Sequence, residues 1–168
     1  MAESKIQSFN HLKIHSQYSI CEGAIKIDDL KDFCKDNKIN SLALCDTENL
    51  CGALEFAEKL SKVGTQPIIG TQINFKYNET IGLLPLYALN KFGYKRIIEL
   101  SSKSYLHNDE ISEPHLDLNE LFEKNQGVAL FTGTINGLFG KLFEKGKFSE
   151  IRELYSKLKS LYHDTFYI

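Results

Sequence analysis

The chain has 168 residues, a formal net charge of −2 and an isoelectric point near 6.2. This length suits a single domain over residues 1–168 with a sizeable core, and the weak negative charge gives no basic field of the kind that attracts duplex DNA. The four cysteines form no C-x-x-C pair. No apolar run approaches the ~20 residues of a membrane span, so we expect a cytoplasmic protein with reduced thiols and no membrane contact.

Residues 9–16, Phe-Asn-His-Leu-Lys-Ile-His-Ser, are predicted to form the first strand. Alternate residues of a strand share one face, so His11, Lys13 and His15 would point one way and the apolar residues between them the other. A row of histidines in this arrangement would suit a metal site at the mouth of a pocket. The middle residue is a lysine, whose protonated amine cannot be a ligand. The stretch is therefore a candidate metal site with one unsuitable position.

The rest of the chain alternates short apolar runs with segments of helical periodicity. Such runs predict buried strands, and apolar residues spaced three and four apart predict amphipathic helices. Strands are predicted at 41–45, 67–75, 81–88, 127–131 and 166–168. Helices are predicted at 27–34, 53–63, 94–105, 118–124, 138–145 and 148–161. The polar segment 107–115 contains a proline and is predicted to be an exposed loop.

The order of these elements favours an α/β fold with a parallel sheet or a barrel. The strands at 67–75 and 81–88 are also expected to pair across the turn at 77–80. In α/β folds, functional groups gather at the C-terminal ends of the strands. The polar residues at those ends are Lys13, His15, Asp46, Thr47, Gln72, Thr132 and Thr134.

Six sequence blocks occur in an order that resembles a known family. They are His11-Leu-Lys-Ile-His15 with its continuation to Gly23, Leu44-Cys-Asp-Thr-Glu-Asn-Leu-Cys-Gly52 with its continuation to Phe56, Pro67-Ile-Ile-Gly-Thr-Gln-Ile-Asn-Phe75, Asn90-Lys-Phe-Gly-Tyr94, Leu100-Ser-Ser-Lys-Ser-Tyr105 and Gly127-Val-Ala-Leu-Phe-Thr-Gly133. Together they resemble the polymerase-and-histidinol-phosphatase (PHP) domain of bacterial DNA polymerase III alpha subunits. The resemblance implies a distorted (β/α)7 barrel. This chain would be its incomplete N-terminal portion, with the last strands and the polymerase palm, fingers and thumb following Ile168.

The resemblance also implies where metal ligands would stand. The family's ligand positions fall on Lys13, His15, Glu22, Thr47, Gln72, Leu83 and Thr134, with Asp46 beside them. Only His15 and Glu22 keep a ligand side chain, while the others carry lysine, threonine, glutamine or leucine. We therefore expect a degenerate pocket without metal or catalytic residues. We also expect Lys13 to occupy the space of a lost cation and to pair with Glu22 or Asp46.

Three local patterns leave alternatives open. Glu22 and Asp46 would be either a general acid and base or part of an ion-pair network. Cys45 and Cys51 would be either thiol nucleophiles or small buried side chains. Residues 90–94 have the composition of a nucleotide-contact loop, but the same residues would also start a helix at a glycine turn.

The resemblance implies that the full-length protein is a DNA-directed DNA polymerase that extends primers with deoxynucleoside triphosphates and Mg²⁺. The domain itself would be inactive and need no cofactor. It would be a structural module that also docks the proofreading exonuclease subunit within the polymerase III holoenzyme, with DNA bound by the domains that follow. The alternative is a metal-dependent phosphoesterase or 3′–5′ exonuclease. A third interpretation is a stand-alone amidohydrolase-like domain that ends naturally at Ile168. The number of retained ligands favours the first.

Overall fold

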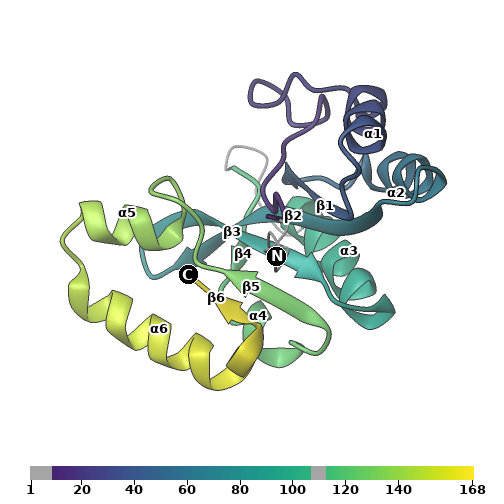
Figure 1. Ribbon diagram of the computed structural model, residues 1–168. Helices are drawn as coiled ribbons and strands as arrows, with labels where there is room; N and C mark the ends of the chain where they lie inside the picture. Colours follow the sequence, from purple (N-terminus) through teal and green to yellow (C-terminus); the bar gives the residue numbers. More distant parts are fainter. Residues whose placement is uncertain (1–8, 107–112) are drawn as a thin grey trace, which may run out of the picture.

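The computed structural model of the chain describes residues 9–106 and 113–168 (Figure 1). The helices are α1 (Ile27–Asp36), α2 (Ala53–Lys62), α3 (Lys91–Leu106), α4 (Glu120–Glu123), α5 (Leu138–Glu144), α6 (Phe148–Tyr162) and the 3-10 helix η1 (His163–Thr165). The strands are β1 (Ser41–Thr47), β2 (Gln66–Tyr77), β3 (Thr80–Ala88), β4 (Leu116–Asp117), β5 (Val128–Phe131) and β6 (Phe166–Tyr167). Most of the loop predicted at 107–115 lies outside the described residues, and its last residues lead into β4.

The strands form one sheet in the order β1-β2-β3-β5-β6, with β4 also paired to β2. The hairpin predicted between β2 and β3 is confirmed, and its turn consists of Asn78 and Glu79. Asn78 has a φ of 52°, as the first position of a tight hairpin turn requires. An all-parallel sheet is wrong, because a two-residue turn can join only antiparallel neighbours. β3 is therefore antiparallel to both β2 and β5, while β1 and β2 are parallel, as are β5 and β6.

The α/β fold class is confirmed, and within residues 9–106 and 113–168 the sheet does not close into a barrel. Along the outer edge of β2, β1 pairs with the first half of the strand and β4 with its far end, at Phe75 and Lys76. None of the helices in the described part of the chain is both long and apolar enough to cross a bilayer.

Residues 9–16 run beside β1 but do not form the regular strand that was predicted. An isolated bridge joins Ile14 to Leu44, and the backbone N–H of Cys45 donates to the carbonyl of Ile14 (2.8 Å). After this contact the chain turns away, and a second isolated bridge joins Ser16 to Ile25. The segment therefore reaches the end of β1 in an irregular conformation.

The core consists of three clusters of buried side chains. One lies among α1, α2 and β1: Ile27, Leu30, Cys34, Leu42, Leu44, Phe56 and Leu60. The largest joins the rest of the sheet to α3, α5 and α6, and Figure 1 shows α3 beside α2 while α5 and α6 lie further away. The third is small: Ala43, Cys45, Tyr87 and Ala129. Residues 43 and 45 alternate with 42 and 44 along β1, so this third cluster lies on the opposite face of that strand.

α3 begins at Lys91, three residues before its predicted start, because Asn90 caps it. The side-chain Oδ1 of Asn90 accepts hydrogen bonds from the backbone N–H groups of Phe92 (2.9 Å) and Gly93 (3.1 Å). Gly93 permits close packing here, since a Cβ would lie 1.7 Å from the carbonyl oxygen of Gly127. Residues 90–94 therefore act as a helix start.

Candidate functional site

A pocket of about 310 Å³ lies between the N-terminal segment, β2, β3 and the loop from β5 to α5. Its walls are formed by Lys13, His15, Glu22, Gln72, Leu83, Gly133, Thr134, Asn136 and Gly137. Of the residues predicted for a degenerate pocket, all but Asp46 and Thr47 line it. Positions far apart in the sequence thus meet at one end of the sheet.

Asp46 lies behind this pocket and is 1% exposed. Its carboxylate accepts hydrogen bonds from the backbone N–H of Ser16 (2.6 Å), from Ser16 Oγ (2.8 Å) and from Ser19 Oγ (2.8 Å). Ser19 Oγ in turn accepts from the backbone N–H of Thr47 (3.0 Å). We call Asp46, Ser16 and Ser19 the aspartate corner. It attaches the turn after the N-terminal segment to the end of β1.

Thr47 links two pocket residues. Its hydroxyl contacts Glu22 Oε2, and its oxygen lies 2.7 Å from Gln72 Nε2. Because an ionised carboxylate only accepts hydrogen bonds, the Thr47 hydroxyl donates to Glu22 and accepts from Gln72. This fixes the Gln72 amide with Nε2 toward Thr47. Gln72 is 3% exposed, and its Oε1 is a buried acceptor with no hydrogen-bond partner among the described residues.

His15 and Lys13 lie on the same wall. His15 Nδ1 is buried without a hydrogen-bond partner in the described part of the chain, and the nearest carboxylate oxygen is Glu22 Oε2 at 3.8 Å. The expected ion pair of Lys13 with Glu22 or Asp46 is wrong, because Thr47 engages Glu22 and the serines of the aspartate corner engage Asp46. Lys13 therefore lines the pocket without pairing to either carboxylate.

Leu83 and the loop after β5 form the opposite wall. Leu83 forms an isolated bridge with Gly137 and offers no side-chain donor to the pocket. Thr134 and Asn136 are exposed at the rim and contribute a hydroxyl and an amide. This side of the pocket is thus apolar at the wall and neutral-polar at the mouth.

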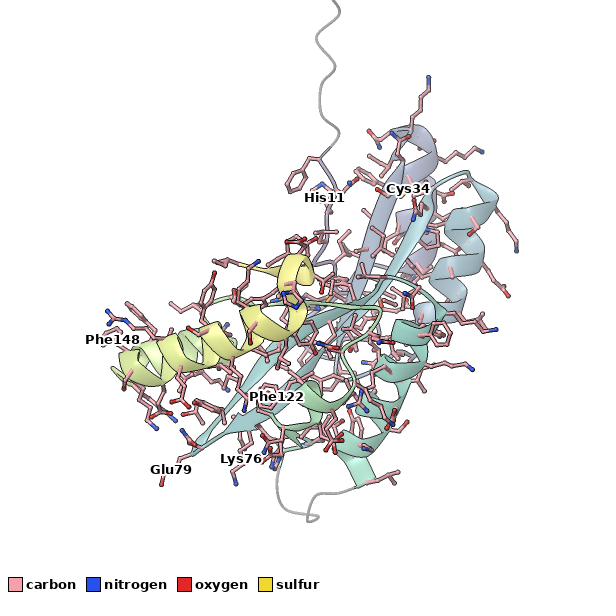
Figure 2. The ribbon with its side chains drawn as sticks, turned by 90° about the horizontal axis from the view of Figure 1, so that it is seen from below. His11, Cys34, Lys76, Glu79, Phe122 and Phe148 are labelled. Atoms are coloured by element: carbon pink, nitrogen blue, oxygen red, sulfur yellow. The ribbon has the colours of Figure 1, made fainter. Side chains whose placement is uncertain are left out.

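His11, the third candidate of the N-terminal stretch, does not line the pocket. It is exposed, and its ring packs edge-on against Phe9 with centroids 4.9 Å apart. Figure 2 shows it at the other end of the molecule from Lys76 and Glu79, which mark the tip of the β2–β3 hairpin. The proposed row of three side chains is thus reduced to Lys13 and His15.

The two cysteines considered as nucleophiles have different surroundings. Cys45 is fully buried, and desolvation raises the pKa of its thiol to about 12. A thiol with such a pKa is almost entirely protonated at neutral pH and is a poor nucleophile. Cys51 is exposed and does not line the pocket. Neither supports a thiol mechanism in this pocket.

Glu48 is a feature that the sequence patterns did not single out. It directly follows Thr47, has a φ of 58°, and its Oε1 accepts a hydrogen bond from Asn74 Nδ2 (2.6 Å). Desolvation raises the pKa of its carboxyl group, and the bond from Asn74 opposes this. With Glu22 it lines a neighbouring hollow of about 240 Å³. Its place after a strand was the only available signal, because a left-handed backbone at a glutamate cannot be foreseen from residue type.

A larger hollow of about 460 Å³ lies along α3, away from this pocket. Its buried cation, Arg96, is paired with Glu99 (2.9 Å) and Glu120 (3.4 Å). These carboxylates neutralise the guanidinium, so the hollow presents no unpaired charge from it. We therefore assign the candidate site to the pocket at Lys13 and Gln72.

The chain belongs to the PHP domain family, whose model matches residues 11–168. The DNA polymerase III subunit alpha of Caulobacter vibrioides is 33% identical over 181 residues, covering 100% of this chain and 15% of that protein. The same subunit of Rickettsia felis is 32% identical over 160 residues, covering 95% of this chain and 13% of that protein. The chain thus spans about 15% of the length of these curated relatives. Among solved structures, an amidohydrolase from Chromobacterium violaceum with bound sulfate and no metal has a TM-score of 0.46 at 17% identity, covering 56% of this chain and 32% of that chain.

The pocket's donor set does not fit the metal centre that the PHP resemblance implies. A cluster of ions needs several imidazoles or carboxylates around each one. Among the described residues, Glu22 is the only carboxylate that lines the pocket and His15 the only imidazole, and Lys13 adds a positive charge. Across residues 9–106 and 113–168, no group of three or more His, Cys, Asp or Glu side chains is placed to hold a metal ion.

Proposed function

We propose that this chain is the PHP domain of a DNA polymerase III alpha subunit, and that the domain is a catalytically inactive docking module for the proofreading exonuclease subunit. The observation that carries the proposal is the pocket's composition. One carboxylate, one imidazole and one lysine line it, with Gln72, Leu83 and Thr134 at the other ligand positions. The alpha-subunit assignment is supported by relatives of that name aligned over the whole chain.

The activity proposed for the whole protein is primer extension with deoxynucleoside triphosphates and Mg²⁺, within the polymerase III holoenzyme in the cytoplasm. Nucleotidyl transfer of this kind uses carboxylates that hold two metal ions. Because the pocket offers only Glu22, we assign the reaction and DNA binding to other parts of the protein. This domain would need no cofactor of its own.

The test is capture of the purified proofreading exonuclease subunit by the 168-residue chain, with and without EDTA. We expect equal capture in both buffers, and no hydrolysis of p-nitrophenyl phosphate when Zn²⁺ or Mn²⁺ is added. Failure to capture the exonuclease in either buffer contradicts the docking role. Metal-dependent hydrolysis contradicts the inactivity.

A metal-dependent phosphoesterase or 3′–5′ exonuclease is the second candidate. The observation that favours it is the buried Nδ1 of His15, which has no hydrogen-bond partner within residues 9–106 and 113–168 and lies 3.8 Å from Glu22 Oε2. This candidate requires stoichiometric, tight binding of Zn²⁺ or Mn²⁺ that is lost in His15→Asn and kept in the exposed control His163→Asn. Metal analysis of the three proteins separates it from the first proposal.

A further inference from the structure

The hollow of about 460 Å³ lies between α3 and the loop that leads from α4 to β5. We propose that it binds single-stranded DNA, by stacking of a base on Phe92 and by contacts of Lys95 and Lys124 with phosphates. Glu123 accepts a hydrogen bond from the exocyclic amine of the stacked base. The inference does not rest on the docking role. The primer–template duplex remains assigned to other parts of the protein, because a duplex hides the faces of its bases from an aromatic side chain.

Phe92 supplies the stacking surface. It is the second residue of α3, lines the hollow and is 77% exposed. The side chain of Asn90 accepts a hydrogen bond from its backbone N–H (2.9 Å), so the helix cap holds the backbone that carries the ring. No other aromatic ring within residues 9–106 and 113–168 packs against it. Every unpaired base has a π-face that can stack on such a ring.

The charges of the hollow favour a polyanion. Arg96 and Glu99 lie 2.9 Å apart and neutralise each other. Lys95 and Lys124 line the same hollow, are exposed and form no ion pair with a residue in the described part of the chain. Lys95 lies three residues after Phe92 on the same face of α3, and Lys124 directly follows α4. Each ammonium can donate charge-assisted hydrogen bonds to phosphate oxygens without first breaking an ion pair.

The remaining polar groups suit the edge of a base better than an acidic peptide. Glu123 lines the hollow, is exposed and has no ion-pair partner among the described residues. Its ionised carboxylate only accepts hydrogen bonds, so it suits the exocyclic amine of cytosine or adenine and disfavours the O4 acceptor of thymine. Gln126 adds an exposed amide with both a donor and an acceptor. An acidic peptide would bring its carboxylates against Glu123 and has no base to place on Phe92.

Fluorescence anisotropy of labelled oligodeoxycytidine, about 12 nucleotides long, with the 168-residue chain tests the proposal. Between about 50 and 200 mM NaCl, the logarithm of the association constant should fall with the logarithm of the salt concentration. The expected slope is about −1.4, at ~0.7 for each of two phosphate contacts. Lys95→Met and Lys124→Met should each reduce the slope by about 0.7, whereas Lys62→Met, at an exposed lysine outside the hollow, should leave it unchanged.

The stacking and the base edge are tested in the same assay. Phe92→Ala should weaken binding ~10-fold with an unchanged salt slope. Phe143→Ala, at a phenylalanine that is 62% exposed on α5, should bind like the wild type. Oligothymidine should bind at least ~5-fold more weakly than oligodeoxycytidine. Glu123→Gln should remove this preference, because a glutamine amide offers both a donor and an acceptor.

Phe92, Lys95 and Lys124 are exposed, so their variants should keep the wild-type circular dichroism and melting temperature. The proposal is overturned if the strand does not bind, if Phe92→Ala binds it normally, or if either lysine variant keeps the full salt slope. It is also overturned if oligothymidine binds as tightly as oligodeoxycytidine, or if a poly-glutamate peptide of equal charge displaces the strand.

Discussion

Two buried polar residues on neighbouring strands, Asp46 near the end of β1 and Gln72 in the middle of β2, have opposite surroundings. Asp46 accepts hydrogen bonds on both carboxylate oxygens from Ser16 and Ser19, whereas Gln72 Oε1 accepts none from the described residues. An unpaired buried acceptor costs about 1–3 kcal/mol of stability, so the two sites differ in what they contribute. The aspartate corner stabilises the fold, whereas the unpaired acceptor of Gln72 lowers the stability of the fold at a pocket wall, as unsatisfied polar groups at functional sites do.

The strongest test of the aspartate corner is Asp46→Ala. The change removes the acceptor of three hydrogen bonds and leaves buried serine donors unpaired. We expect a loss of about 3–5 kcal/mol in the free energy of unfolding, measured by urea titration. The exposed control Asp36→Ala should change it by less than ~0.5 kcal/mol. A loss below ~1 kcal/mol in Asp46→Ala would show that the aspartate corner does not stabilise the fold.

Gly23→Ala tests the same corner through its backbone. A Cβ at this position would lie 2.1 Å from the carbonyl oxygen of Ser16 and 2.7 Å from that of His15. Neither backbone atom can move aside without disturbing the corner, so we expect about 2–3 kcal/mol of destabilisation in the same titration. The exposed neighbour Ala24→Ser is the control. An unchanged urea midpoint in Gly23→Ala would contradict the close packing.

Thr47→Val sharpens the contrast at the pocket wall. Valine keeps the shape but loses the hydroxyl that donates to Glu22 and accepts from Gln72. We expect about 1–2 kcal/mol of destabilisation. Thr134→Val at the exposed rim controls for the stability effect. A Thr47→Val protein with the stability of the wild type would contradict the two hydrogen bonds assigned to this hydroxyl.

Glu48→Gln gives the smallest effect, and its sign follows from the pKa. Desolvation raises the pKa of Glu48 in the folded protein above its ordinary value of 4.5, so the folded protein favours the protonated carboxyl group and ionisation of Glu48 destabilises the fold. The stability that the protonated carboxyl group contributes is fully present below the ordinary pKa and is lost as the pH rises through the raised pKa. Glutamine stays neutral, so at pH 7 the variant should be more stable, by less than ~1 kcal/mol for a half-exposed group. Unfolding from pH 4 to 8 should show the difference vanish at the acidic end; a difference that grows on acidification contradicts the assignment.

Much of the fold could be predicted from the sequence because buried strands have a clear pattern. The run at residues 41–45 predicted β1, and the two runs around the turn at Asn78 predicted β2, β3 and their pairing. The regular strand at residues 9–16 was wrong because the pattern shows which side chains alternate, but not whether the backbone keeps its register with β1. The sheet was predicted to be parallel but is mixed, because the short turn makes β3 antiparallel to β2.

The pocket's members could be predicted only through the family resemblance, and its hydrogen bonds not at all. Lys13 was expected to pair with a carboxylate on charge alone. The carboxylates are instead engaged by short hydroxyl groups of Ser16, Ser19 and Thr47. These lose little side-chain entropy on ordering, whereas a lysine loses much more. Sequence spacing does not reveal which of several possible donors forms the hydrogen bond with a given carboxylate. The choice of donor determines which charged groups of the pocket remain unpaired.

The two-residue turn between β2 and β3 also bears on the order in which the molecule assembles. It joins the two longest strands, and their contacts close the smallest loops in the sheet. The entropic cost of loop closure is smallest for this hairpin, so we expect it to form early. β1 and β6 depend on contacts between residues distant in sequence and are expected to form later. Pulse-labelled hydrogen exchange should find the amides of β2 and β3 protected before those of β1 and β6, and the reverse order would exclude this route. The polar pocket would then be completed late, because the N-terminal segment and the β5–α5 loop have to join the walls that β2 and β3 already provide.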